Sequence, residues 1–271
     1  MSSYVLSLFR TLSFPLCSLS LTLTLSLSLS LLAPPHITSI LIQIGQGCGG
    51  GPLESNLSSY LVKPLHRKWS QGCTLLEGGS TLGAIARLVE TYPSTFQSFD
   101  VNPRTVAKQG GGRAAGKIWS YISCFAVSHA HLDHCLGLVV SSGASLQPRP
   151  LYGTCRTIQN LERVMDGGPW PKLAGREDDG ITLGRAYLYR QLETSRTDYV
   201  PLSEELSLRA WPLSHGMDPS KFKRADCHQD ECYDSTAFFI RNDALQKEFL
   251  FFGDVEPGIV SFKSKSPIIA N

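Results

Sequence analysis

The sequence Ser-His-Ala-His-Leu-Asp-His, at residues 128–134, follows an apolar run at residues 122–127 and precedes Cys-Leu-Gly-Leu at residues 135–138. Three of the chain's 7 histidines lie in this stretch, together with an aspartate. Imidazole and carboxylate groups are the ligands that zinc and similar divalent metals favour, and a tight turn can direct them towards more than one metal. A histidine-rich loop without a ligand is the alternative, but four ligand-type side chains seldom gather at a strand end without a site. The stretch therefore predicts a metal site where a strand gives way to a helix.

Composition and charge exclude few functions. The chain has 271 residues, and its 25 basic and 23 acidic side chains give a formal net charge of +2. This balance gives no reason to expect nucleic acid or an anionic membrane as partner. The length fits one large α/β domain or two small ones, and a hydrophobic fraction of 42% is enough for a core. The 8 cysteines form no Cys-x-x-Cys pair, which favours reduced thiols in an intracellular, cytoplasmic protein over a disulfide framework.

Residues 1–36 differ from the rest of the chain, because leucine alternates with serine or threonine through residues 19–31. A signal peptide needs a basic start and an uninterrupted apolar centre, and a membrane helix needs about 20 mostly apolar residues. Neither pattern is present, and so long a period-two strand would be an aggregation-prone edge. We expect low-complexity sequence without a folded role, no genuine signal peptide and no stable membrane insertion, with a targeting segment as the alternative.

A folded domain is expected at residues 37–258, followed by an unstructured tail at residues 259–271. Ser80 or Thr81 is expected to cap a helix that ends before Pro93. Apolar runs bounded by turn residues predict strands at residues 37–44, 56–63, 73–76, 151–153, 181–192 and 206–213, and a hairpin with arms at 237–241 and 248–252.

The chain between these elements offers weaker signals. Residues 93–117 contain the run Gly110 to Gly112 and predict a connecting loop of no clear structure, with a flexible linker favoured over a phosphate-binding loop. The helix after the histidines is expected to begin at about Leu136 and to be broken by Gly143.

Two further ligand candidates follow predicted strands. His215 comes after the strand at residues 206–213, and Asp254 comes after the second arm of the hairpin. Each is weak alone, since a loop histidine is usually solvated and an aspartate after a strand is usually a turn former. Together with the histidine stretch, they have the requisites of a two-metal site.

Several of these segments resemble one family. The pattern His-x-His-x-Asp-His at a strand-to-helix turn resembles the signature of the metallo-β-lactamase superfamily. A narrower resemblance, to the class II cyclic nucleotide phosphodiesterases, rests on three segments and covers about residues 38–258. They are Gly-Cys-Gly-Gly-Gly-Pro-Leu-Glu-Ser-Asn-Leu-Ser-Ser-Tyr-Leu at residues 47–61, His-Ala-His-Leu-Asp-His-Cys-Leu-Gly at residues 129–137, and Ala-Phe-Phe-Ile-Arg at residues 237–241 with Phe-Phe-Gly-Asp-Val-Glu-Pro at residues 251–257.

The resemblance implies a fold, a reaction and a cofactor. The fold would be an α/β, metallo-β-lactamase-like αββα sandwich, here missing its C-terminal strands and helix. The reaction would be hydrolysis of 3′,5′-cyclic AMP to the 5′-nucleotide, with cyclic GMP as a second candidate substrate, and it would lower cyclic nucleotide signalling. The cofactor would be two divalent metal ions, with Zn²⁺ expected. The partner would be the small cyclic nucleotide and no nucleic acid, and the oligomeric state is not predicted.

The resemblance also implies roles for individual residues. The implied ligands are His129, His131 and His215 for the first metal, Asp133 and His134 for the second, and Asp254 as the bridging carboxylate. Besides binding the second metal, Asp133 is the candidate for relaying a proton to the leaving alkoxide.

Residues outside the ligand set are implied to support it or to contact substrate. Glu77 stands where the superfamily usually has an aspartate, and it is expected to orient a ligand histidine. Glu54, Asn56 and Ser58 border the glycine-rich loop and are candidate substrate contacts, with turn-forming and strand-edge roles as the favoured alternative.

One departure from the family puts activity in doubt. The family's second metal has a further histidine after the bridging aspartate, but this sequence contains no histidine after His228. His228 as a substitute ligand, or a separate Cys/His/Cys zinc site around it, is a weaker alternative. A truncated relative that folds poorly and turns over little, and a hydrolase of another ester, are therefore the other two hypotheses.

Overall fold

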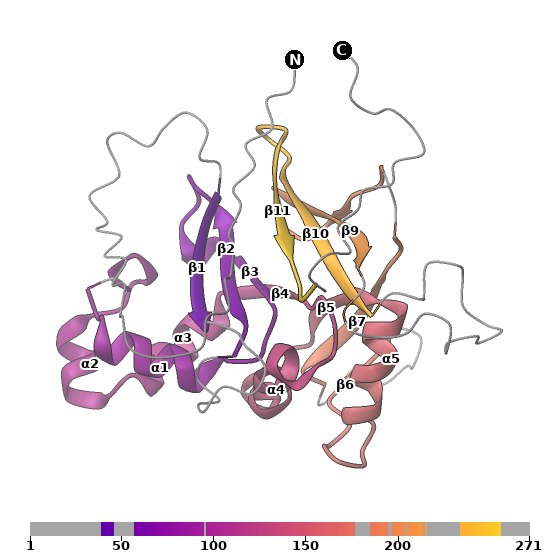
Figure 1. The fold of residues 1–271 in the computed structure, drawn as a ribbon. Coiled ribbons are helices and arrows are strands. Elements are labelled where there is room, and N and C mark those ends of the chain that lie inside the picture. The colour runs from indigo at the N-terminus through magenta and orange to yellow at the C-terminus, as the bar shows by residue number, and fades with distance from the viewer. Residues whose placement is uncertain are drawn as a thin grey trace, which may run out of the picture.

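The computed structural model describes residues 39–45, 57–94, 96–176, 185–194, 197–203, 205–213, 215 and 234–255. Two β-sheets face each other in this part of the chain, and the helices lie beside the first sheet (Figure 1). The predicted domain at residues 37–258 and its flanking segments extend beyond the described residues, so their bounds stay predictions. No helix in the described ranges is both long enough and apolar enough to cross a membrane.

The first sheet mixes antiparallel and parallel strands. Its first three strands form the expected antiparallel meander, and the next strands pair in parallel because helices return the chain across the sheet. The spatial order of its strands is β1 (Ser39–Gly45), β2 (Ser59–Pro64), β3 (Cys73–Leu76), β4 (Ile122–Ala126), β5 (Arg149–Thr154), β7 (Tyr187–Leu192) and β6 (Ala174–Gly175).

The second sheet is antiparallel throughout. The hairpin expected from the apolar runs at residues 237–241 and 248–252 is confirmed, with Phe238 opposite Phe251 and the turn at residues 243–246. The spatial order of its strands is β11 (Lys247–Phe252), β10 (Ser235–Asn242), β9 (Leu206–Leu213) and β8 (Val200–Pro201).

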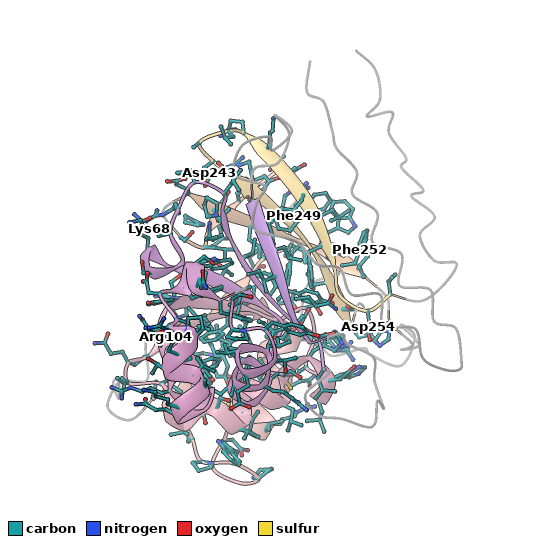
Figure 2. All side chains as sticks on the ribbon, turned by 90° about the vertical axis from the view of Figure 1, so that its left-hand side faces the viewer. Lys68, Arg104, Asp243, Phe249, Phe252 and Asp254 are labelled. Carbon is teal, nitrogen blue, oxygen red and sulfur yellow. The ribbon has the colours of Figure 1, made fainter. Side chains whose placement is uncertain are left out.

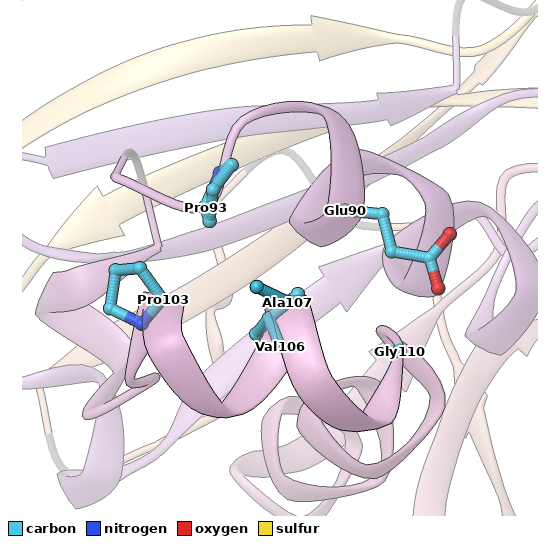
Figure 3. Close-up of a pocket in the computed structure, with 6 residues that line it drawn as sticks. All are labelled: Glu90, Pro93, Pro103, Val106, Ala107 and Gly110. Carbon is cyan, nitrogen blue, oxygen red and sulfur yellow. The ribbon is translucent and has the colours of Figure 1, made fainter.

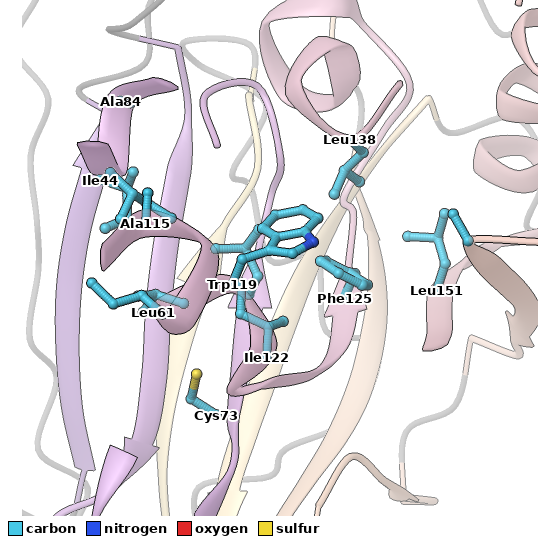
Figure 4. Packing of buried hydrophobic residues seen from close by; sticks show 14 of the residues in the cluster. Ile44, Leu61, Cys73, Ala84, Ala115, Trp119, Ile122, Phe125, Leu138 and Leu151 are labelled. Atoms are coloured by element: carbon cyan, nitrogen blue, oxygen red, sulfur yellow. The ribbon is translucent and has the colours of Figure 1, made fainter. Parts of the chain in front are cut away.

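Two cores hold these layers together. The first lies between the first sheet and its helices, where Trp119 lies beside Phe125 (Figure 4). The ring centroids of Trp119 and Tyr187 are 5.4 and 5.2 Å from that of Phe125. All five described α-helices contribute to it: α1 (Leu82–Thr91), α2 (Pro103–Gln109), α3 (Gly112–Ser120), α4 (Leu132–Ser141) and α5 (Cys155–Val164).

The second core lies between the two sheets. It contains Val62 and Leu76 of the first sheet and Phe238 and Ile240 of the second. Strands β3 and β4 send side chains into both cores, so both of their faces are buried, as is usual for central strands with parallel partners. The loops that follow β3 and β4 therefore begin at strands that are held by packing on both faces.

The prediction of a structureless loop at residues 93–117 is wrong, because α2 lies within this range and α3 begins in it. Asn102 caps α2 by accepting a hydrogen bond from Arg104 N, and Pro103 occupies the first turn. The glycine run is a packed helix connection: Gly111 N donates to Glu90 Oε1 at 2.6 Å, and a Cβ at position 111 would lie 2.1 Å from the Ala86 carbonyl oxygen.

The cavity beside this connection contains none of the expected functional residues. Figure 3 shows Glu90 and Gly110 at one side of it and two prolines at the other. Its lining residues are Glu90, Pro93, Pro103, Val106, Ala107 and Gly110.

Helix α4 starts earlier than predicted, and α1 begins after Thr81 as predicted but without a side-chain capping bond from that residue. Helix α4 begins at Leu132 with His131 as its N-cap, four residues before the predicted Leu136, so Asp133 and His134 lie in its first turn. The hydroxyls of Ser80 and Thr81 do not cap α1: Ser80 Oγ accepts from Leu57 N, and Thr81 Oγ1 donates to Gly137 O. Both hydroxyls instead fasten the loop after β3 to neighbouring segments.

Candidate metal centre

The expected ligands lie at strand ends from both sheets. Glu77 follows β3 and the histidine stretch follows β4, while His215 and Asp254 follow β9 and β11. Figure 2 shows Asp254 at the end of the β10–β11 hairpin opposite to Asp243, which lies at the turn. The ends of these four strands meet at one edge of the two sheets.

Two groups of potential ligand atoms form at this edge, and His129 belongs to both. His129, His131 and His215 make the first group, and the ligand atoms within each group lie within 4.8 Å of one another. His129, His134 and Asp254 make the second. The structure thus brings together five of the six predicted ligands, and the sixth, Asp133, has its Oδ2 atom 3.4 Å from His134 Nε2.

His129 is held as a neutral imidazole with one nitrogen aimed at the centre. It is 2% exposed, and burial together with neighbouring His134 and His131 lowers its pKa to about 3. A hydrogen bond of 2.9 Å joins Nδ1 to Ser128 Oγ, while Nε2 faces His131 Nδ1 at 3.0 Å. A neutral ring that donates from Nδ1 keeps a lone pair on Nε2, which is the form a metal requires.

His134 shows that the centre is built for positive charge. Burial lowers its pKa, but Glu77, Asp133 and Asp254 outweigh burial and raise the pKa to about 12. Its Nδ1 lies 3.3 Å from Glu77 Oε2, and its Nε2 lies 3.4 Å from an oxygen of each aspartate. Neither buried ring nitrogen has a hydrogen bond of ordinary geometry within the part of the chain that the structure describes. Orphaned nitrogens among three carboxylates fit a divalent metal, which would supply both the charge and the missing bonds.

Asp254 faces both ligand groups. Its Oδ1 lies 3.4 Å from His134 Nε2, and its Oδ2 lies 3.4 Å from His215 Nε2. The imidazole of His134 lowers the pKa of Asp254 to about 2 against the opposing effect of burial, so the carboxylate is ionised at neutral pH. A carboxylate with one oxygen towards each group has the geometry of a bridging ligand.

Glu77 lies behind the histidines. It is 1% exposed, and its carboxylate accepts from Ser128 N at 3.3 Å while facing His134. Its φ angle of 57° is uncommon for any residue but glycine, and Glu77 N donates to Ala126 O at 2.8 Å. A strained backbone held at this place is typical of a residue that must point in one direction.

Backbone contacts from the segments that precede β2 and follow β3 hold the metal loop, which is defined here as residues 128–134. Ser58 N donates to Asp133 O at 3.0 Å, and Gly78 N donates to His134 O at 2.7 Å. A Cβ at Gly79 would lie 1.9 Å from Asp133 O, so this close approach requires glycine.

Of the three candidate substrate contacts, only Ser58 is described. It is 7% exposed, and its backbone supports the metal loop. Glu54 and Asn56 lie outside the described residues, as does His228 with its neighbouring cysteines.

The sequence analysis missed the small and polar residues that adjoin the ligands. Ser128 contacts His129, and Asp234 Oδ1 accepts from His215 N at 2.5 Å. Gly253 lies against Ser128 and Ser235. Their position next to a candidate ligand was the one signal available, because serine, glycine and aspartate are also common turn residues.

Comparisons with known proteins point to one family. The family described as cAMP phosphodiesterases class-II matches residues 37–269. A 3′,5′-cyclic-nucleotide phosphodiesterase of Schizosaccharomyces pombe is 29% identical over 228 residues, which are 82% of this chain and 59% of the relative. The phosphodiesterase of the same name from Aliivibrio fischeri is 26% identical over 220 residues, which are 80% of this chain and 58% of the relative. The chain therefore spans less than two thirds of the length of either relative.

A solved structure shows the same fold. The crystal structure of unliganded yeast PDE1 superposes with a TM-score of 0.63 at 17% identity, covering 81% of this chain and 66% of that one. Together with the two facing sheets and the helices beside the first, this likeness confirms the predicted α/β, metallo-β-lactamase-like sandwich.

Proposed function

This chain belongs to the class-II cAMP phosphodiesterase family, and from that premise we propose that it hydrolyses 3′,5′-cyclic AMP to the 5′-nucleotide in a metal-dependent reaction. Cyclic GMP is a second candidate substrate, and the consequence would be lower cyclic nucleotide signalling. The observation that carries the proposal is the meeting of two ligand groups that share His129, with Asp254 facing both.

The donors suit two divalent ions, with Zn²⁺ as the expected metal because imidazole and carboxylate are its usual nitrogen and oxygen ligands. His129, His131 and His215 would hold the first ion, Asp133 and His134 would hold the second, and Asp254 would bridge them. When bound, such ions neutralise charge on a phosphate group and lower the pKa of water.

The protein groups around the ligands would prepare the reaction in two ways. Glu77 would fix the ring of His134 through its contact with Nδ1 at 3.3 Å. The burial of His129 and His134 would exclude water around these two rings and strengthen the electrostatic interactions there.

Asp133 would move the proton. Its pKa is lowered by His134, so it is ionised and able to accept a proton from the attacking water. It would then pass that proton to the ribose 3′ oxygen as the phosphorus–oxygen bond breaks.

Glu54, Asn56 and Ser58 stay candidate substrate contacts, with support of the metal loop as the role that the contacts of Ser58 favour. The cytoplasmic location also stays a prediction.

The test uses the full 271-residue chain. Its metal content is measured after purification, and hydrolysis of cyclic AMP and cyclic GMP is followed by chromatography of the nucleotide products. We expect 5′-AMP to form, formation to stop on chelation, and added Zn²⁺ to restore it.

The controls separate the competing hypotheses. A metal-loaded chain that ignores both cyclic nucleotides but hydrolyses a thioester or a lactone would indicate a hydrolase of another ester. A folded chain that binds no metal and turns over nothing would support an inactive relative.

A further inference from the structure

The end of β11 packs against the start of the histidine stretch with no room for a side chain. A Cβ built at Gly253 would lie 2.3 Å from Ser128 Oγ, 2.5 Å from Ser128 Cβ and 2.8 Å from Ser235 Oγ. Real Cβ atoms do not come so near to other atoms, so the backbone at 253 would have to move if any side chain were present. Gly253 N also donates to Thr236 O at 3.2 Å, which fixes its place in the second sheet.

Ser128 cannot yield to such a side chain. It is fully buried, and its N–H donates to the Glu77 carboxylate while its carbonyl accepts from Thr157 Oγ1. Its hydroxyl is joined to His129 Nδ1 at 2.9 Å. Each polar group of Ser128 is therefore engaged within the first sheet and its helices.

The contact joins strand ends that carry ligands. Ser128 directly precedes His129, and Gly253 directly precedes Asp254. Ser235, the third member of the contact, is 3% exposed and follows Asp234, whose carboxylate holds the backbone of His215. Among the described residues the Ser235 hydroxyl has no hydrogen-bond partner, so its place against Gly253 is one of packing.

We infer that the contact of Gly253 with Ser128 and Ser235 is the spacer that sets Asp254 opposite His129 and His134. In this arrangement Ser128 is a positioning residue with two functions: its hydroxyl orients the His129 ring, and its surface sets the approach of Asp254. The inference rests on the proposed metal centre and adds what fixes the distance between its two halves.

The first test introduces a methyl group into the contact. In Gly253→Ala the strand end must move away from Ser128, so affinity for Zn²⁺ should fall by about 10- to 100-fold, the range seen when groups behind metal ligands are changed. The matched control is Gly83→Ala in α1, where a Cβ would meet nothing within 4 Å, and it should bind Zn²⁺ as the parent chain does.

The second test asks for rescue. Ser128→Gly removes the Cβ and Oγ atoms that the new methyl group meets, so Gly253→Ala should cost less in the Ser128→Gly background than in the parent. We expect the combined loss to be smaller than the product of the single losses by at least about threefold. A general weakening of the strand would show no such interaction.

The readouts do not depend on turnover. Zn²⁺ affinity is measured by competition with a chelating dye in the full chain, and the visible absorption of bound Co²⁺ reports the geometry of the ligands. Urea unfolding of the metal-free proteins measures stability separately. Ser128→Ala, which removes the hydroxyl but keeps the Cβ, should alter the Co²⁺ spectrum through His129.

Each outcome decides between the proposals. Equal Zn²⁺ affinity in Gly253→Ala and the parent, or an equal cost of that change in both backgrounds, would overturn the spacer. If Gly253→Ala does not fold, a normal Co²⁺ spectrum in Ser128→Ala would overturn the role of Ser128. A parent chain that binds neither Zn²⁺ nor Co²⁺ would overturn the metal centre and this inference with it. Metal binding without hydrolysis would contradict only the proposed function.

Discussion

The first sheet supplies four candidate ligands from one turn, whereas the second sheet supplies two from different strand ends. Burial differs among these ligands: His129 and His134 are each 2% exposed, whereas His131 is exposed and the side chains of His215 and Asp254 are 27% and 41% exposed. The first half is fixed by buried groups around it, and the second is placed by contacts of its backbone.

The largest effect should come from the residue that both ligand groups share. His129→Ala should remove ligands from both groups and reduce cyclic AMP hydrolysis by about 1,000-fold or more, because the metals supply several kcal/mol of transition-state stabilisation. Metal analysis and steady-state kinetics measure the two losses. His66→Ala is the matched control, since His66 pairs with Glu205 and belongs to neither group. Retention of both metals by His129→Ala would show that His129 is not a ligand shared by the two groups.

A change in the second half should divide the centre. Asp254→Asn keeps the shape of the side chain but removes the charge that faces both groups, so we expect activity to fall by about 100-fold and metal content to fall from two equivalents towards one. The three histidines of the first group would keep the remaining ion. Asp243→Asn, at the other end of the same hairpin, should leave metal content unchanged. Two full equivalents in Asp254→Asn would show that the second half is not needed for binding.

Glu77, the carboxylate behind His134, should matter through its charge. Glu77→Gln should lower Zn²⁺ affinity by about 10- to 100-fold, because it removes one of the carboxylates that favour positive charge at His134. Glu77→Asp keeps that charge and should lose less. Competition titrations with a chelating dye compare the three proteins. Similar affinity in Glu77→Gln and the parent would place Glu77 outside the metal centre.

The smallest expected effect concerns β4, the strand that precedes the histidine stretch. Burial raises the pKa of Cys124 on β4 from 9.0 to about 11, so above pH 9 the unfolded state loses the thiol proton before the folded state does. The free energy of unfolding should then fall as pH rises, by up to about 1.4 kcal/mol per pH unit for this thiol.

Urea unfolding between pH 8 and pH 10.5 measures this slope. Cys124→Ala should flatten it, whereas the half-buried Cys155 offers the control Cys155→Ala. Parallel slopes in the parent and in Cys124→Ala would show that this thiol does not couple the first sheet to alkaline pH.

Much of the local structure could be predicted from the sequence. Strands β3 and β9 have the predicted limits, and the hairpin is confirmed. Each depends on a short apolar run bounded by turn or capping residues. Such a pattern reflects interactions among residues that are neighbours in the chain.

The errors came where distant segments use the same residues differently. The run Gly110 to Gly112 suggested a linker, but Gly111 is required by the close approach of the Ala86 carbonyl. Ser80 and Thr81 suggested a helix cap, but their hydroxyls bond to Leu57 and Gly137. A local pattern cannot indicate a contact made by a residue far away in the sequence.

The same distinction separates the two halves of the metal centre. The sequence alone determined the types and spacing of the four candidate ligands at residues 129–134, because one strand-to-helix turn contains all of them. Only the tertiary structure decided that His215 and Asp254 meet them, that His129 belongs to both groups, and that Gly253 lies against Ser128. Those distances depend on how two sheets pack across a shared core, and that packing is a property of the whole fold.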